Sequence, residues 1–111
     1  MKNSYRTYLQ HILDAIQNIE EFTSGCAKEK FFKTRMIQDS VIRNLEIIGE
    51  AAKHIPPAIR KKHASIEWKR IAGMRDILIH EYFGVDLDRV WQVVKARLPE
   101  LKERIDNILC E

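Results

Sequence analysis

Apolar residues recur every three or four positions along most of this chain, and no other feature restricts its fold as much. Residues with that spacing line one face of an α-helix, and that face must be buried against another element. The first stripe predicts a helix that is capped by Asn3 or Ser4 and runs to about Phe22, where Thr-Ser-Gly ends it. Its apolar positions are Tyr5, Leu9, Ile12, Ile16 and Ile19.

A second stripe predicts a helix from about Lys30 to His54. Pro56 and Pro57 cannot continue it, and Pro57 favours the start of a short helix at Ala58–Lys62. The stripe positions are Ile37, Val41, Leu45, Ile48, Ala51, Ala52 and Ile55. The basic run Arg60 to His63 is interpreted as a solvated face, with nucleic-acid contact as the alternative.

A third helix is predicted around the segment from 71 to 83, with Ser65 able to cap its start and Gly84 ending it. A fourth follows Asp86, a favourable N-cap, and carries a long apolar seam from Leu87 to Ile108. Pro99 lies inside that seam, so we expect a kink or a break into two segments there.

Together these stripes predict an all-α fold, an antiparallel, up-and-down four-helix bundle whose C-terminal helix is broken by proline. The four glycines and three prolines are too few for a fold with many turns, and 111 residues favour one helical domain over 1–111. Cys26 and Cys110 have no ligand or disulfide pattern and are predicted to be thiols of a reducing compartment. The sequence shows no signal region and no run of 18 apolar residues, so we expect a cytoplasmic protein that makes no membrane contact.

Asn44 is a polar residue in the apolar sector of the second helix. A buried amide needs hydrogen-bond partners, so Asn44 is expected to find them inside the fold. One interpretation is a structural asparagine that bonds a neighbouring helix and fixes its register. The other is that Asn44 holds Arg75 or touches a ligand, and the two are compatible.

Arg75 lies in the middle of the apolar side of the third helix. An unpaired buried charge is very costly, so a guanidinium at this position requires an anionic partner. A buried carboxylate from Glu46 or Glu50 is one such partner, although both are predicted to face outwards. The other possibility is that this side of the helix borders a cleft in which Arg75 meets an anionic ligand.

Four residues in this helix favour one reaction that needs no metal. RNA carries its own nucleophile, the 2′-hydroxyl, so a protein need only move protons and stabilise the charged phosphorane. His80 suits the proton transfer and Arg75 suits the phosphate. Asp76, one turn before His80, could orient the imidazole, and Tyr82 could bond a phosphate or stack on a base. No phosphate-binding glycine loop or metal-ligand spacing is present, so no metal and no cofactor are expected.

The spacing of Arg75 and His80 also bears on assembly. Five residues separate the two side chains by about 140° around a helix and about 7.5 Å along it. One helix therefore cannot easily direct both groups to one phosphorus. Two copies of the helix across a two-fold axis could share a cleft, so we expect a homodimer.

The segment RDILIHEY, Arg75 to Tyr82, resembles the hallmark R-x4-6-H of the HEPN superfamily and the R-x4-H-x-Y motif of its HepT branch. RNLEIIGEAAKHIP, Arg43 to Pro56, is similar to the second-helix pattern of that branch. IEWKRIAGMRDILIHEYFGVDLDRVWQVV, Ile66 to Val94, is similar to its central block. The resemblance covers nearly the whole chain, with no departure at the motif positions.

This resemblance implies a helical dimer that cleaves RNA without a metal, the toxin of a toxin–antitoxin pair. Its implied partner is a minimal nucleotidyltransferase antitoxin, which can attach AMP to the tyrosine at position 82. By position, Arg75 and His80 would be catalytic, Tyr82 would be the AMP acceptor, and Asp76 would support the site. Apart from the resemblance, Tyr82 and Asn44 are also candidates for supporting the site or binding RNA. The alternative is a non-catalytic helical dimer that binds a nucleotidyltransferase or a nucleotide.

Overall fold

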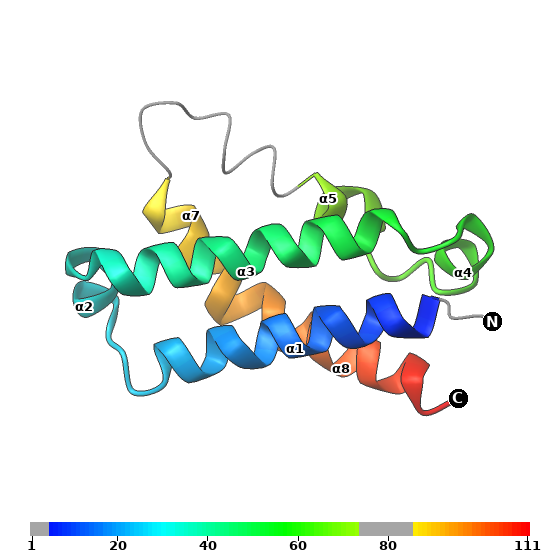
Figure 1. The fold of residues 1–111 in the computed structure, drawn as a ribbon, viewed down its shortest axis with the longest axis horizontal. Coiled ribbons are helices and arrows are strands. Elements are labelled where there is room, and N and C mark those ends of the chain that lie inside the picture. Colours follow the sequence, from blue (N-terminus) through cyan, green and yellow to red (C-terminus); the bar gives the residue numbers. More distant parts are fainter. Residues whose placement is uncertain (1–4, 74–85) are drawn as a thin grey trace.

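The computed structural model describes residues 5–73 and 86–111, and every element in these two segments is a helix (Figure 1). The elements are α1 (Tyr5–Thr23), α2 (Lys28–Lys33), α3 (Arg35–Lys53), α4 (Pro57–Lys62), α5 (Trp68–Ala72), α7 (Leu87–Gln92), the π-helical turn η1 (Val93–Arg97) and α8 (Leu98–Leu109). The predicted all-α class is therefore confirmed for these segments. No helix within them is both long and apolar enough to cross a membrane.

Helices α1 and α3 form the central pair and run antiparallel, side by side (Figure 1). The stripe predicted for the first helix is the face that α1 buries, although Tyr5 is only half-buried. The helix ends at Thr23, one residue after the predicted end. The matching face of α3 is also buried, although Ile37 remains half-buried. The fully buried residues of this contact are Leu9, Ile12, Ile16, Ile19, Val41, Leu45, Ile48 and Ala52.

Helix α8 packs against α1 and runs antiparallel to it. Two polar contacts fix this orientation at opposite ends of α1. Near the start of α1, Arg6 Nη2 donates to the carbonyl oxygen of Leu109 at 2.6 Å. Towards the end of α1, Lys102 Nζ lies 2.9 Å from Glu20 Oε1. Between these contacts the apolar seam of α8 is buried, at Leu98, Leu101, Ile105 and Ile108.

The single helix predicted from Lys30 to His54 is wrong, because the chain forms two helices, α2 and α3, separated at Thr34. Thr34 is extended (φ −114°, ψ 97°), and its hydroxyl donates to the carbonyl oxygen of Lys30 at 2.7 Å. The break lets α2 turn so that Phe31 enters the core, where its ring lies 5.1 Å from that of Trp91. A tertiary contact therefore outweighs the local helical periodicity here.

The predicted irregularity near Pro99 takes the form of a π-helical turn just before the proline. Leu98 N donates to the carbonyl oxygen of Val93, five residues earlier, in place of the usual four. Proline has no N–H, and its ring would clash with the carbonyl four positions before it, at Lys95. The wider turn relieves this clash, and the helical path continues as α8 without a loop.

The basic run after α3 is only partly the solvated face that was predicted. Arg60 is half-buried, and its guanidinium donates to the carbonyl oxygens of Ile55 and Ala52 at 3.0 and 2.8 Å. Ala52 lies in the last turn of α3 and Ile55 lies two residues beyond the end of this helix, where the helix dipole favours a cation. Lys62 and His63 lie 3.6 and 3.5 Å from Glu111.

The cap at Asp86 yields the first testable expectation. As predicted, its carboxylate accepts a hydrogen bond from the backbone N–H of Arg89, at 3.2 Å, at the start of α7. Replacing Asp86 with alanine should lower the free energy of unfolding by about 0.5–2 kcal/mol, because that donor loses its partner. Urea denaturation measures the loss. Asp106→Ala, at an exposed position within α8, is the matched control and should change stability by less than about 0.5 kcal/mol.

Candidate functional site

A groove of about 820 Å³ separates α5 from the segment formed by α7, η1 and α8. Its charged lining residues are Glu67, Arg70, Arg89, Arg97, Glu100 and Arg104. Its apolar lining residues are Ile66, Ile71, Val93, Ala96, Leu98 and Leu101. The groove therefore combines an apolar floor with a charged rim. Residues 74–85 follow α5 and precede α7 in the sequence. Both of these flanking helices line the groove.

Trp68 holds α5 in place at one wall of the groove. Its side chain is 5% exposed, and its indole Nε1 donates to the carbonyl oxygen of His63 at 3.1 Å. Trp68 is therefore a core anchor at the start of α5. Ser65 does not cap this helix as predicted, because the chain first becomes helical at Trp68, and Glu67 occupies the N-cap position without a side-chain cap bond.

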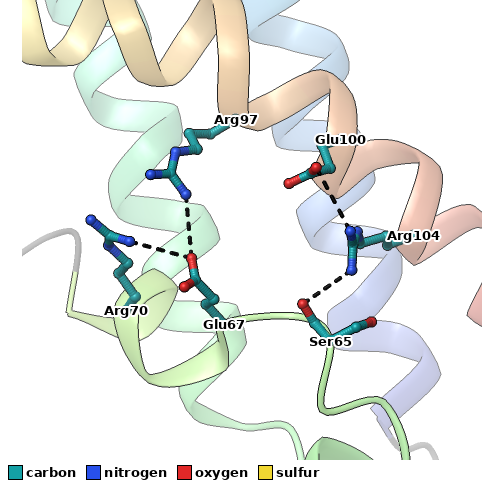
Figure 2. Close-up of polar contacts among 6 residues, drawn as sticks. All are labelled: Ser65, Glu67, Arg70, Arg97, Glu100 and Arg104. Atoms are coloured by element: carbon teal, nitrogen blue, oxygen red, sulfur yellow. Dashed lines mark hydrogen bonds and ion pairs between the residues drawn. The ribbon is translucent and has the colours of Figure 1, made fainter.

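Glu67 lies between two arginines that come from opposite walls of the groove (Figure 2). Its Oε1 atom lies 3.4 Å from Arg70 Nη1 on α5 and 3.3 Å from Arg97 Nη1 on η1. The π-helical turn thus places Arg97 opposite α5. All three side chains are more than half exposed, so solvent weakens these ion pairs.

Arg104, on α8, contacts the segment that leads into α5 (Figure 2). Its Nη1 donates to the carbonyl oxygen of Ser65 at 3.0 Å, and its Nη2 lies 3.7 Å from Glu100 Oε2. Ser65 therefore contributes its backbone carbonyl to this contact, in place of the predicted helix cap. With four arginines against two glutamates, the lining of the groove carries two more positive than negative charges.

Asn44 is buried, 6% exposed, between α1 and α3. Its Nδ2 donates to the carbonyl oxygen of Ser40 at 2.8 Å, and its Oδ1 accepts from Asn18 Nδ2 of α1 at 3.2 Å. This is the geometry that the structural interpretation expects, a polar bond between neighbouring helices. A supporting role for Asn44 in RNA binding stays a prediction.

The other site residues predicted from the sequence, Arg75, Asp76, His80 and Tyr82, lie outside the described residues. So does any contact of Arg75 with Glu46 or Glu50. Glu50 is exposed, as predicted, with its carboxylate 3.7 Å from His54 Nε2, whereas Glu46 is half-buried. Within residues 5–73 and 86–111, no three His, Cys, Asp or Glu side chains are grouped closely enough to hold a metal ion.

Sequence reasoning did not find the groove arginines. Three of them, at positions 89, 97 and 104, are spaced by eight and seven residues, which is about two helical turns each. This recurrence on one helical face is a sequence signal that could have revealed them. Glu67 and Arg97 are 30 positions apart, so no local spacing could have predicted that they would meet.

Comparison with known proteins defines the class to which this all-helical chain belongs. The ribonuclease HepT-like family matches residues 12–108, and the chain belongs to that family. No solved structure matches the chain significantly.

The names of several similar proteins agree with membership of this family. The chain is 46% identical over 108 residues to "Probable ribonuclease HepT" of Thermococcus cleftensis, covering 97% of this chain and 98% of that protein. It is 44% identical over 104 residues to a "Putative RNase" of Caldanaerobacter subterraneus subsp. tengcongensis, covering 94% and 93%. It is 50% identical over all 111 residues to "Gamma-glutamylcyclotransferase and putative RNase" of Methanocaldococcus jannaschii, but it spans only 50% of that protein's length.

Proposed function

We propose that this protein is a metal-independent endoribonuclease that acts through Arg75 and His80. The observation that carries the proposal is the R-x4-H-x-Y motif, present without departure inside a segment that matches the ribonuclease HepT-like family. The names of the relatives support the same activity. Additional support comes from the excess positive charge of the groove whose walls flank the motif segment in sequence.

The proposed reaction is an internal transesterification. The 2′-oxygen attacks the adjacent phosphorus, the bond to the 5′-oxygen breaks, and the products are a 2′,3′-cyclic phosphate and a 5′-hydroxyl. His80 takes the proton from the 2′-hydroxyl or delivers one to the leaving 5′-oxygen. Arg75 stabilises the negative charge of the phosphorane through its forked N–H donors. Asp76 orients the imidazole, and Tyr82 lines the cleft.

The proposed assembly is a homodimer of antiparallel helical bundles, with one motif helix from each protomer at a shared cleft. The angular separation of about 140° that the helix predicted from sequence would give Arg75 and His80 supports this arrangement. In the proposed biological setting the protein is the toxin of a toxin–antitoxin pair with a minimal nucleotidyltransferase. Attachment of AMP to Tyr82 would place bulk and negative charge beside the cleft and repel the RNA phosphates.

The product chemistry and its independence from metals test the proposed reaction directly. Purified protein should cleave RNA at an unchanged rate in excess EDTA, since the nucleophile belongs to the substrate and His80 carries the proton. Mass spectrometry should find 2′,3′-cyclic phosphate ends. Loss of cleavage in EDTA with recovery on adding Mg²⁺, or the appearance of 5′-phosphate ends, would contradict the mechanism. A protein without RNase activity that still forms a stable complex with a nucleotidyltransferase would favour the non-catalytic alternative.

A further inference from the structure

We propose that the groove between α5 and η1–α8 holds the RNA backbone beside the scissile phosphate, through Arg70, Arg97 and Arg104. Glu67 occupies the phosphate position between Arg70 and Arg97 when RNA is absent. This inference rests on the proposed ribonuclease function, and it adds a substrate-binding surface outside the Arg-His motif.

The geometry around Glu67 is that of an anion site filled by a side chain. One carboxylate oxygen serves two guanidinium groups from opposite walls, at 3.4 and 3.3 Å (Figure 2). Both distances exceed the 2.7–2.9 Å that is typical of a strong charge-assisted hydrogen bond. Exposed ion pairs of this kind contribute little to stability, so a phosphate can displace the carboxylate at little cost. In this geometry both arginines share Glu67 Oε1, whereas the two non-bridging oxygens of a phosphodiester can each accept from a different arginine.

Arg104 extends the basic surface along α8. It follows Arg97 by seven residues, which corresponds to about 10 Å along a helix, so the two arginines can contact different phosphates of one strand. Its guanidinium is held by the carbonyl oxygen of Ser65 at 3.0 Å, which limits the entropy lost on binding. The apolar floor of the groove offers a surface to ribose and base faces.

The position of the groove in the chain connects it to the proposed reaction centre. Arg75 follows Arg70 by five positions, so their Cα atoms cannot be more than about 18 Å apart whatever the backbone conformation. A strand that contacts Arg70 and Arg97 is therefore within a few nucleotides of a phosphate held by Arg75. The excess positive charge of the groove lining favours a polyanionic partner over a neutral one.

Binding of a 2′-O-methyl RNA oligonucleotide tests the inference, because this strand lacks the nucleophile and cannot be cleaved. Arg70→Ala and Arg97→Ala should each weaken binding by about 3–10-fold at low salt and reduce the slope of log K against log salt by about 1. Glu67→Gln should strengthen binding about 2–5-fold, because the competing carboxylate loses its charge. Fluorescence anisotropy over a salt series gives both quantities, and thermal unfolding confirms that each variant is folded.

The matched controls lie at an exposed ion pair outside the groove lining. Arg35 and Asp39, one turn apart at the start of α3, form this pair at 3.7 Å. Arg35→Ala removes the same charge as Arg97→Ala, and Asp39→Asn removes the same charge as Glu67→Gln. Both controls should bind the strand within about twofold of the unmodified protein, since long-range charge effects are screened by salt.

Two results would overturn the inference. One is equal binding by Arg97→Ala, Arg70→Ala and Arg35→Ala. The other is an unmodified protein that binds no RNA strand but pairs through this groove with a second copy or an acidic protein. Cleavage of ordinary RNA by the same proteins separates this failure from that of the proposed function. If the protein cleaves RNA but the groove variants bind RNA as well as the unmodified protein does, the groove proposal alone is rejected. If the groove variants bind RNA more weakly but no protein cleaves it, the proposed reaction alone is rejected.

Discussion

Replacing His80 with alanine is expected to slow RNA cleavage by about 10²–10⁴-fold, because general acid–base catalysis by a positioned side chain contributes a factor of that size. Binding of the uncleavable strand should persist, since the groove arginines are unchanged. Single-turnover cleavage of a defined oligonucleotide measures the rate, and anisotropy measures the binding. Full RNase activity in His80→Ala would remove the basis for the proposed mechanism.

Arg75→Ala provides a second inactive variant, which turns the same assay into a test of the shared cleft. When Arg75→Ala and His80→Ala proteins are mixed and allowed to exchange subunits, half of the dimers contain one of each. If each site takes Arg75 from one protomer and His80 from the other, every mixed dimer has one intact site. The mixture should then recover about a quarter of the unmodified activity. A mixture that stays inactive despite subunit exchange would mean that both groups act from the same protomer.

The elements that the sequence predicts correctly are those set by nearby residues. The stripe of α1, the proline start of α4 and the Asp86 cap each depend on spacing or chemistry within a few positions. Pro99 indicated an irregular helix, but a local pattern could not distinguish a kink from the π-helical turn that is observed. The motif residues Arg75, Asp76, His80 and Tyr82 stay predictions from sequence.

The features that sequence reasoning missed depend on contacts between distant parts of the chain. Thr34 interrupts a regular apolar stripe because Phe31 gains a core position against α7. The groove exists because α5 and η1, far apart in sequence, face each other across Glu67. Arg60 belongs to a run of basic residues in the sequence. In the fold, its guanidinium donates to the carbonyl oxygens of Ala52 and Ile55 and so caps α3. In each case a tertiary partner decides the role of a residue whose local pattern indicates something else.

Phe31→Ala is expected to cause the largest loss of stability among the substitutions considered. The ring is fully buried, and it links α2 to Trp91 of α7, which leads into the η1 wall of the groove. Truncating a buried phenylalanine costs about 3–5 kcal/mol, since both transfer energy and packing are lost around the cavity that remains.

The measurement is chemical denaturation, with thermal unfolding as a second readout, where the melting temperature should fall by more than about 10 °C. Phe22→Ala makes the same chemical change at a site that is 46% exposed, and it should cost less than about 1 kcal/mol. Because Phe31 packs against α7, which carries Arg89 and leads into η1, the partly unfolded variant should also lose RNA binding in parallel with its folded fraction. Equal stability of the two variants would contradict the prediction that burial of Phe31 stabilises the fold.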